Sequence, residues 1–331
     1  MILTRTPHRL SLCGGGTDIP PLCHELGGMV VGGAITQYAH VVAKRLPPFH
    51  GYKSRITYNK IESVSDHSEI EHRAVRACLD FLRIDYGVEI LYQADIPARS
   101  GTGSSSTFVV GLLNALACLE GKFFTPERLA REAILIERDV LQENVGYQDQ
   151  IWAASHTGGP ATIRFLQDGT YVVSPLGLTA DAARDLEEHL FLFFTNMPRN
   201  STEVAATYYD RLKDMRQYHY SLLELTERAV TAIRRSDHEG LGKLLDLSWR
   251  AKSMLSPAVN PPRVSELYMR ARLAGAWGGK LMGAGGGGTL VVAAPKEKSV
   301  ELIAEMVGQG CVHIPFRFAP VGSYVAMADS Q

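Results

Sequence analysis

A loop of glycines and small hydroxyl residues is the most informative chemical feature of the sequence. Ser100-Gly101-Thr102-Gly103-Ser104-Ser105-Ser106 runs directly into the apolar segment 107–119, which predicts an amphipathic helix. The two glycines permit positive φ, so the backbone N–H groups of such a loop can surround a phosphate at a helix N-terminus. The serine hydroxyls can bind phosphate or Mg²⁺. Taken alone, the segment is also compatible with a plain glycine-serine turn that caps a helix.

Two further glycine-rich segments lie near the two ends of the chain. The first is Pro7–Asp18, which contains Gly14-Gly15-Gly16-Thr17-Asp18, and the second is Lys280–Gly288. The second segment satisfies the pattern G-x-G-x-x-G, but it leads into an expected strand at 289–294 instead of opening a helix. This order argues against a dinucleotide-binding fingerprint, and therefore against a nicotinamide oxidoreductase. No Walker A pattern occurs in the chain.

Together, the three segments resemble the three motifs of the GHMP kinase superfamily, which includes galactokinase, homoserine, mevalonate and phosphomevalonate kinases. Segment 97–106 is similar to the second motif, P-x-x-x-G-x-G-S-S-A, with Ser106 in place of Ala. The resemblance implies an α+β fold with an N-terminal domain like ribosomal protein S5 domain 2 and a ferredoxin-like C-terminal domain. We expect these domains to span 1–187 and 188–331, with the active site in the cleft between them.

The resemblance also implies phosphoryl transfer from ATP with Mg²⁺. Ser105 and Glu137 are expected to bind the metal, and Asp149 is expected to face the acceptor hydroxyl as a base or an orienting group. Arg9 is expected to lie beside Asp149. Structural alternatives remain open: Glu137 as a solvated helix carboxylate, Asp149 as a helix cap, and Arg9 as a purely structural ion-pair partner. The expected ligands of the ATP phosphates are Gly101, Thr102, Gly103, Ser104, Ser105 and Ser106.

The form of the first motif points to the acceptor. Gly14-Gly15-Gly16-Thr17-Asp18 looks like the branch that contains D-glycero-D-manno-heptose 7-phosphate kinases and the kinase part of L-fucokinase. We therefore expect phosphorylation of the anomeric hydroxyl of the heptose 7-phosphate to the 1,7-bisphosphate, in nucleotide-activated heptose biosynthesis. An unphosphorylated sugar such as L-fucose, or a non-catalytic sugar and ATP sensor, are the alternatives. The expected substrate ligands are Gly15, Gly16, Thr17, Asp18, Arg99, Arg199 and Gly285, with Arg250 and Lys252 as further cations for a phosphate.

Local patterns predict the elements that must position these residues. Gln167-Asp168-Gly169 predicts a hairpin turn, and Thr125-Pro126 predicts a helix start. Mixed strands and helices give way to a second α+β unit near 180–190, which predicts the domain boundary. The expected strands are 2–5, 33–45, 55–58, 88–94, 161–165, 171–174, 190–195, 289–294 and 313–318. The expected helices are 69–82, 107–119, 125–142, 201–235, 239–254, 262–275 and 296–308.

Composition limits the possible partners. The chain has 331 residues, of which 45% are hydrophobic and 21% charged, as in an ordinary globular protein. A net charge of −1 gives no general attraction to nucleic acid or to an anionic membrane. Five scattered cysteines without metal-ligand spacing, and no apolar run long enough to span a membrane, predict a cytoplasmic protein with free thiols. A monomer and a homodimer are both compatible with the sequence.

Overall fold

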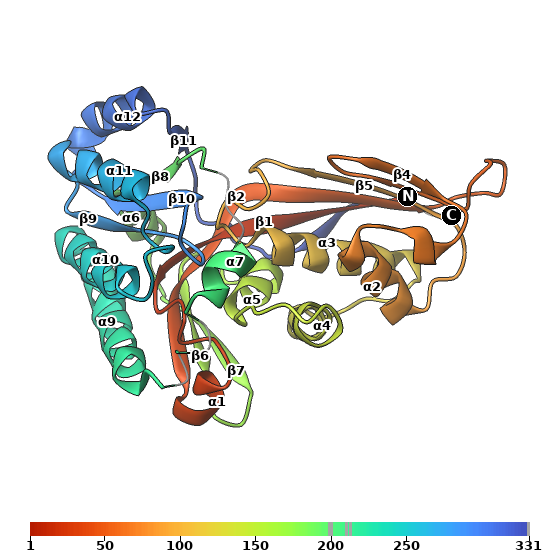
Figure 1. Cartoon of the computed structure of the whole chain (residues 1–331), viewed down its shortest axis with the longest axis horizontal. Coiled ribbons are helices and arrows are strands. Elements are labelled where there is room, and N and C mark those ends of the chain that lie inside the picture. The colour runs from red at the N-terminus through yellow and green to blue at the C-terminus, as the bar shows by residue number, and fades with distance from the viewer. Residues whose placement is uncertain (198–200, 209–210, 212–213, 330–331) are drawn as a thin grey trace.

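Two β-sheets with helices packed against them form the framework of the protein (Figure 1). The computed structural model describes residues 1–197, 201–208, 211 and 214–329. The larger sheet has the strand order β12-β1-β2-β5-β3-β4, with β6 on β2 and β7 on β6, and the smaller sheet has the order β11-β8-β10-β9. The strands are β1 (Ile2–Cys13), β2 (Gly28–Arg45), β3 (Ser54–Thr57), β4 (Ile61–Val64), β5 (Val88–Ala94), β6 (Ala161–Phe165), β7 (Tyr171–Pro175), β8 (Leu190–Phe194), β9 (Gly278–Leu281), β10 (Thr289–Ala293), β11 (Val312–Ile314) and β12 (Tyr324–Ala328).

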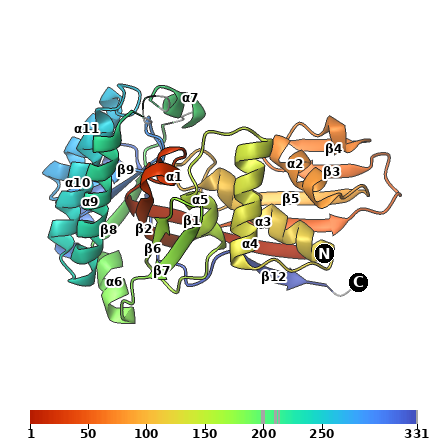
Figure 2. The same cartoon turned by 90° about the horizontal axis from the view of Figure 1, so that it is seen from below.

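Helices α9 and α10 from the second part of the chain contact the larger sheet and share a core with Leu10 and Leu12 of β1. The helices of the first part of the chain lie together on one side of the larger sheet (Figures 1 and 2). They include the central helix α3, which contacts both β1 and β2. The helices are α1 (Leu22–Leu26), α2 (Arg73–Leu82), α3 (Ser104–Leu119), α4 (Pro126–Leu135), α5 (Gln148–Ala154), α6 (Ala180–Glu188), α7 (Ser201–Ala206), α9 (Arg216–Arg234), α10 (His238–Ser253), α11 (Pro262–Leu273) and α12 (Ser299–Gly308). This arrangement confirms the expected α+β architecture.

Helix α3 is buried on nearly all sides, so the expectation of an amphipathic helix was wrong. Leu112, Leu113 and Leu116 have no exposed surface. The sheet covers one side of α3, and α2, α4 and α5 pack around the rest. A helix in the middle layer of a domain is apolar all round because every side meets another element. The N-terminus of α3 is thereby held rigidly at the end of the glycine-serine loop.

Helix α4 begins as expected but ends early. Thr125 is its N-cap, and its Oγ1 accepts a hydrogen bond from Arg128 N at 3.3 Å. The α-helix stops at Leu135 and continues as one π-helical turn, Ile136–Val140, where Leu141 N donates to Ile136 O. The expected single helix at 125–142 is therefore two segments. Such π-turns shift the register of the side chains that follow, and they are frequent at functional sites.

The smaller sheet is buried on both faces, and its strand β8 lies where the sequence predicted a strand at 190–195. Leu190 and Leu192 pack in a core with α9 and α10, and Phe191 and Phe193 pack on the opposite face with α11 and α12. The first of these cores also contains Leu10 from β1, so it joins the two sheets. The two parts of the chain therefore share apolar packing beside the cleft described below.

Several elements differ from expectation. The expected helix at 201–235 is broken into α7 and α9, and α6, β9 and β12 were not expected at all. Strand β9 has a glycine-rich sequence because α10 packs closely on it: a Cβ at Gly278 would lie 2.0 Å from Gly242 O. Strand β12 pairs with β1 in the larger sheet, so the C-terminal end of the chain joins the sheet of the first part. A division at 187/188 remains a prediction.

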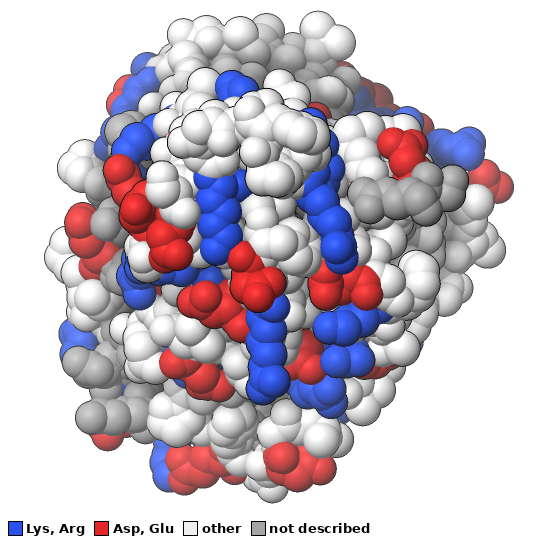
Figure 3. Space-filling model, turned by 90° about the vertical axis from the view of Figure 1, so that its right-hand side faces the viewer, with Lys and Arg blue, Asp and Glu red and all other residues white. Residues whose placement is uncertain are grey.

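Charged side chains of both signs lie on the surface of the larger sheet. Basic and acidic side chains are interspersed on the face shown in Figure 3. Ion pairs on the larger sheet and its surroundings include Lys44–Glu89 at 2.7 Å and Arg45–Glu120 at 3.2 Å. All five cysteines are free thiols, as expected. Among the described residues, no helix combines the length and the apolar character that a membrane span requires.

Candidate active site

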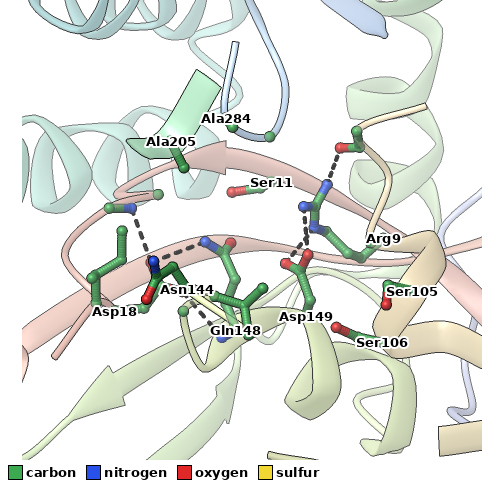
Figure 4. Close-up of a pocket in the computed structure, with 18 of the residues that line it drawn as sticks. Arg9, Ser11, Asp18, Ser105, Ser106, Asn144, Gln148, Asp149, Ala205 and Ala284 are labelled. Carbon is green, nitrogen blue, oxygen red and sulfur yellow. Dashed lines mark hydrogen bonds and ion pairs between the residues drawn. The ribbon is translucent and has the colours of Figure 1, made fainter. Parts of the chain in front are cut away.

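A cleft opens where β1, the start of α3 and the loop after β9 meet (Figure 4). All three glycine-rich segments contribute to its wall, although they lie at the start, the middle and the end of the sequence. The residues with a predicted role that line the cleft are Arg9, Gly15, Gly16, Asp18, Arg99, Gly101, Gly103, Ser104, Ser105, Ser106, Asp149 and Lys252. The structure therefore brings most of the predicted site together.

The glycine-serine loop presents an open helix N-terminus to the cleft. Gly101 and Gly103 have φ angles of 81° and 76°, which L-residues with a side chain rarely adopt. Gly103 is the N-cap of α3, and no side chain caps the first N–H groups of this helix. Uncapped N–H groups together with the helix dipole attract an anion. The loop thus fits a phosphate better than the plain capped turn that the sequence left open.

Arg9 and Asp149 form a two-pronged ion pair beside this loop. Arg9 Nε donates to Asp149 Oδ1 and Arg9 Nη2 donates to Asp149 Oδ2, both at 2.8 Å. The Arg9 side chain is 5% exposed and the Asp149 side chain 25%, so the carboxylate can still be reached from the cleft. A Cβ at Gly103 would lie 3.3 Å from Asp149 Cγ, which means that the loop packs directly against the pair.

The backbone around Arg9 explains its position. The pairing register of β1 with β2 shifts between Pro7 and Arg9, and Pro7 has no N–H to give to the ladder. Arg9 N instead donates to Thr102 O at 3.1 Å, and its Nη1 donates to Gly101 O. Irregularities of this kind re-aim side chains. Here the irregularity joins the first motif to the phosphate loop.

Glu137 is buried behind the loop and contacts it through serine hydroxyls. Ser105 Oγ donates to Glu137 Oε1 at 2.9 Å, and Ser106 Oγ donates to Glu137 Oε2 at 2.6 Å. Gln150 Nε2 donates to the same Oε2 atom. Burial raises the pKa of Glu137 to about 7, and the hydrogen bonds from Ser106 and Gln150 act in the opposite direction. Glu137 is therefore not the solvated carboxylate that the sequence left possible.

The Ser105 and Glu137 oxygens fit a magnesium ion. Mg²⁺ binds oxygen at about 2.0–2.1 Å in octahedral geometry, so two neighbouring ligands lie about 2.9 Å apart. Ser105 Oγ and Glu137 Oε1 lie 2.9 Å apart as donor and acceptor of a hydrogen bond, and a bound metal would replace that bond. One hydroxyl and one carboxylate, supplemented by phosphate oxygens and water, are a usual donor set for Mg²⁺ in proteins.

Asp18 is fully engaged with its own chain. Its Oδ1 accepts from Gly16 N at 2.9 Å and from Gln148 Nε2 at 3.1 Å, and its Oδ2 accepts from Gln148 N at 3.2 Å. Burial raises its pKa, with the nearby Asp149 charge acting in the same direction. A Cβ at Gly146 would lie 2.0 Å from Asp18 Oδ2. Asp18 thus anchors the start of α5, which carries Asp149.

Three of the predicted substrate or phosphate ligands do not line the cleft. Thr17 is buried, its Oγ1 bonds to Gly14 O and Met29 O at 2.9 Å each, and it does not line the cleft. Thr102 is also buried, with its Oγ1 2.6 Å from Ser100 Oγ. Gly285 has φ of 113°, and a Cβ there would lie 2.8 Å from Val259 Cα. Each of these residues shapes a loop instead of facing the cleft.

Only some of the predicted phosphate-binding cations line the cleft. Arg99 and Lys252 line the cleft, and Lys252 Nζ donates to Gly283 O. Arg250 does not line it and pairs with Asp246 at 2.8 Å on α10. Arg199 lies outside the described residues.

Sequence reasoning missed three buried polar residues in the cleft wall: Ser11, Gln148 and Lys280. Lys280 Nζ donates to Ser11 O at 3.2 Å, and burial lowers the pKa of Lys280 to about 8. A lysine in the middle of a glycine-rich, otherwise apolar strand is a sequence signal that could have drawn attention to it. Gln148 directly precedes Asp149, and Ser11 follows Arg9 by two residues.

A second group of potential metal ligands lies outside the cleft in the described part of the chain. It consists of Asp185, His189 and His238. His238 Nε2 lies 2.6 Å from Asp185 Oδ2, the two imidazole rings stack at 4.2 Å, and Lys296 Nζ is 4.0 Å from Asp185 Oδ1. Because His238 and Lys296 already contact this carboxylate, we interpret the group as a polar network of the protein's own side chains.

Comparisons with known proteins agree with the geometry of the cleft. Residues 72–159 match the family model described as the GHMP kinases N terminal domain, and residues 229–313 match the model of the GHMP kinases C terminal domain. The chain is 29% identical over 316 residues to the D-glycero-alpha-D-manno-heptose 7-phosphate kinase of Campylobacter jejuni, covering 91% of this chain and 92% of that protein.

Two further similarities extend over nearly the whole chain. The L-fucokinase/L-fucose-1-P guanylyltransferase of Bacteroides fragilis is 26% identical over 363 residues, covering 95% of this chain and 37% of that protein. A crystal structure of a D-glycero-D-manno-heptose 1-phosphate kinase from Bacteroides thetaiotaomicron superposes with a TM-score of 0.81 at 23% identity, over 100% of both chains. The latter likeness shows a shared fold.

Proposed function

The chain belongs to the GHMP kinase family and is an ATP-dependent phosphotransferase, and from this premise we propose that it phosphorylates the anomeric hydroxyl of D-glycero-D-manno-heptose 7-phosphate to the 1,7-bisphosphate. The observation that carries the catalytic part is the Arg9–Asp149 pair, bonded twice at 2.8 Å beside the uncapped N-terminus of α3. Phosphoryl transfer needs such an arrangement of an acceptor-facing carboxylate and a phosphate cradle.

The donor half of the site is the loop 101–106. Its backbone N–H groups and the start of α3 bind the ATP phosphates, with Ser104, Ser105 and Ser106 supplying hydroxyls. Ser105 and Glu137 hold Mg²⁺, which when bound neutralises charge on the donor phosphates. The burial of Glu137 keeps this carboxylate in one orientation, so it acts as a fixed ligand.

The acceptor half of the site is centred on Asp149. Its carboxylate accepts the proton of the acceptor hydroxyl, or orients that hydroxyl for in-line attack. Arg9 holds the carboxylate by both oxygens, which removes the rotational freedom that would otherwise reduce the fraction of productive complexes. An anomeric hydroxyl is more acidic than other sugar hydroxyls, so a weaker base at Asp149 is enough to accept its proton.

Two observations support a sugar phosphate as the acceptor. The similarity to the Campylobacter heptose 7-phosphate kinase covers nearly all of both chains. In addition, Arg99 and Lys252 line the cleft, and guanidinium and ammonium groups suit a phosphate. An L-fucokinase-like activity on an unphosphorylated sugar is the second candidate, because the similarity to the Bacteroides fragilis fucokinase covers 95% of this chain.

The proposed reaction places the protein in the cytoplasm, in the synthesis of nucleotide-activated heptose for capsule or other surface polysaccharide. Its partners are then the sugar phosphate and ATP, with no nucleic acid or membrane, and it acts as a monomer or homodimer. We further propose that residues 1–187 form the N-terminal kinase domain with the phosphate loop and that residues 188–331 form the C-terminal domain.

A coupled ADP-release assay with ATP, Mg²⁺ and a panel of sugars and sugar phosphates tests this function. We expect turnover on the heptose 7-phosphate, with ³¹P NMR locating the new phosphate on C1. Turnover on L-fucose but not on the heptose 7-phosphate would overturn the proposed substrate. Asp149→Asn should lower kcat by about 10²–10⁴-fold. Binding of ATP and sugar without any turnover would instead indicate a sensor.

A further inference from the structure

Three buried polar side chains at the floor of the cleft have few hydrogen-bond partners among the described residues. Ser11, Gln148 and Lys280 all line the cleft and are 4%, 8% and 5% exposed. Among the described residues, Ser11 Oγ and Gln148 Oε1 have no hydrogen-bond partner, and Lys280 Nζ has only Ser11 O. A buried polar atom without a partner is unfavourable, and native proteins contain few of them. Two such atoms that lie together in one cleft point to a polar ligand.

The three groups lie together. A Cβ at Gly15 would be 3.5 Å from Ser11 Oγ and 3.4 Å from Gln148 Nε2, so both side chains border the same point. Lys280 contacts the same residue from the smaller sheet, because its Nζ donates to the backbone carbonyl of Ser11 at 3.2 Å. The cluster, which we call the polar floor (Ser11, Gln148 and Lys280), therefore joins residues of both parts of the chain.

The polar floor lies beside the reacting groups. Ser11 follows Arg9 by two residues on β1, and residues two apart on a strand point to the same face. Gln148 directly precedes Asp149 at the start of α5. Figure 4 shows Ser11, Gln148 and the Arg9–Asp149 pair around the same part of the cleft. A molecule whose hydroxyl reaches Asp149 must therefore present its neighbouring groups to the polar floor.

Asp18 determines which end of the Gln148 amide faces the cleft. Gln148 Nε2 donates to Asp18 Oδ1 at 3.1 Å, and a carboxylate can only accept, so the amide nitrogen must point to Asp18. The carbonyl Oε1 is thereby left without a partner as an acceptor. Asp18 Oδ1 accepts from Gly16 N and Gln148 Nε2, and Asp18 Oδ2 accepts from Gln148 N. Asp18 therefore holds the Gln148 side chain in place.

We propose that the polar floor binds the acceptor sugar through the hydroxyls next to the one that is phosphorylated, and that Asp18 acts on the sugar only through Gln148. Gln148 Oε1 accepts from one hydroxyl, Lys280 Nζ donates to a sugar oxygen, and Ser11 Oγ donates or accepts. A hydroxyl both donates and accepts, so this donor and acceptor set suits a polyol better than a second phosphate. The proposal rests on the proposed function as a sugar kinase but not on which sugar is the substrate.

Steady-state kinetics of Gln148→Leu, Ser11→Ala and Lys280→Met test the polar floor. Ser221→Ala is the matched control, because Ser221 is a half-buried serine on α9 that does not line the cleft. We expect the KM for the sugar to rise tenfold or more in each variant, the KM for ATP to stay within twofold of wild type, and the control to change neither. We also expect a sugar that lacks the hydroxyl bound by Gln148 to have at least tenfold lower affinity for wild type than the parent sugar. The two sugars should bind Gln148→Leu with equal affinity.

A double variant tests the role of Asp18. Asp18→Ala should raise the sugar KM in wild type and should raise it clearly less in the Gln148→Leu background, where only the hydrogen bond from Gln148 N remains to be lost. A merely structural Asp18 would raise the sugar KM equally in both backgrounds, which would overturn the positioning role. Thermal melts of each variant separate misfolding from loss of binding.

The assays use whichever sugar the wild type turns over, so a wrong heptose assignment leaves the polar floor testable. Titration calorimetry with the sugar alone gives a readout without ATP. Unchanged sugar affinity in all three variants, or an equal rise in the KM for ATP, would overturn the polar floor. A wild-type protein that binds no sugar in the panel would overturn both the polar floor and the proposed function.

Discussion

Replacing Gly146 by alanine should disable the site without touching any group that reacts. A Cβ at this position would lie 2.0 Å from Asp18 Oδ2 and 2.6 Å from Asp18 Cγ. Ordinary contacts are about 3.4 Å or longer, so the carboxylate or the backbone of residue 146 must move by about 1 Å or more. Because Asp18 accepts hydrogen bonds from both Gln148 N and Gln148 Nε2, this shift displaces the start of α5.

The expected magnitude follows from this displacement. A misplacement of about 1 Å at a catalytic group costs about 10²-fold in rate, so Gly146→Ala should lower kcat/KM by about that factor. Overpacking should lower the free energy of unfolding by about 1–3 kcal/mol. The ADP-release assay measures the first quantity and urea denaturation the second. The protein should remain folded, so the loss of activity should exceed what the loss of stability explains.

Gly51→Ala is the matched control, because no atom lies within 4 Å of a Cβ at Gly51. It should leave kcat/KM and stability unchanged. The contact with Asp18 is tested by a double variant: in an Asp18→Gly background, Gly146→Ala should cause no further loss of activity. Wild-type kcat/KM in Gly146→Ala, or a full additional loss in the Asp18→Gly background, would refute the assigned role of this contact.

Three further predictions concern the metal, the pH and the core. Ser105→Ala should raise the Mg²⁺ concentration needed for half-maximal rate about tenfold, and an unchanged metal titration would contradict its role as a ligand. Burial lowers the pKa of Lys280 to about 8, with Cys13 and Asp18 raising it and Arg9 lowering it, so its charge is lost above that pH. The sugar KM should therefore rise from about pH 7 to 9 in wild type and stay flat in Lys280→Arg, and a flat wild-type profile would count against Lys280. Leu112→Ala, at a fully buried position, should lower the free energy of unfolding by about 2–5 kcal/mol in urea while keeping kcat, whereas no loss would contradict tight packing around α3.

Elements with strong local signals could be predicted from the sequence. Strand β5 spans Val88–Ala94 and β6 spans Ala161–Phe165, as their patterns predicted, and Thr125 caps α4. These signals are the alternation of side chains, a tight turn and a capping hydroxyl, which act within a few residues. The three glycine-rich motifs are local in the same sense. They were therefore recognisable before any tertiary contact was known.

Elements that depend on distant partners could not be predicted in this way. Strand β9 is glycine-rich because α10 approaches it closely, and β12 exists because β1 offers it an edge at the other end of the chain. The π-turn at Ile136–Val140 lies in a sequence that has ordinary helical character. Their stabilisation comes from packing and pairing across the fold, which intrinsic propensity does not contain.

The same distinction between local and long-range interactions applies to the candidate site. The sequence by itself determined which residue types are available: a phosphate loop, a carboxylate at Asp149 and an arginine at Arg9. Only the tertiary structure decided which polar atoms lack a partner, because a hydrogen bond between residues far apart in the chain uses one atom of a side chain and leaves another unpaired. The bond from Gln148 Nε2 to Asp18, 130 positions apart, leaves the buried Gln148 Oε1 without a partner among the described residues.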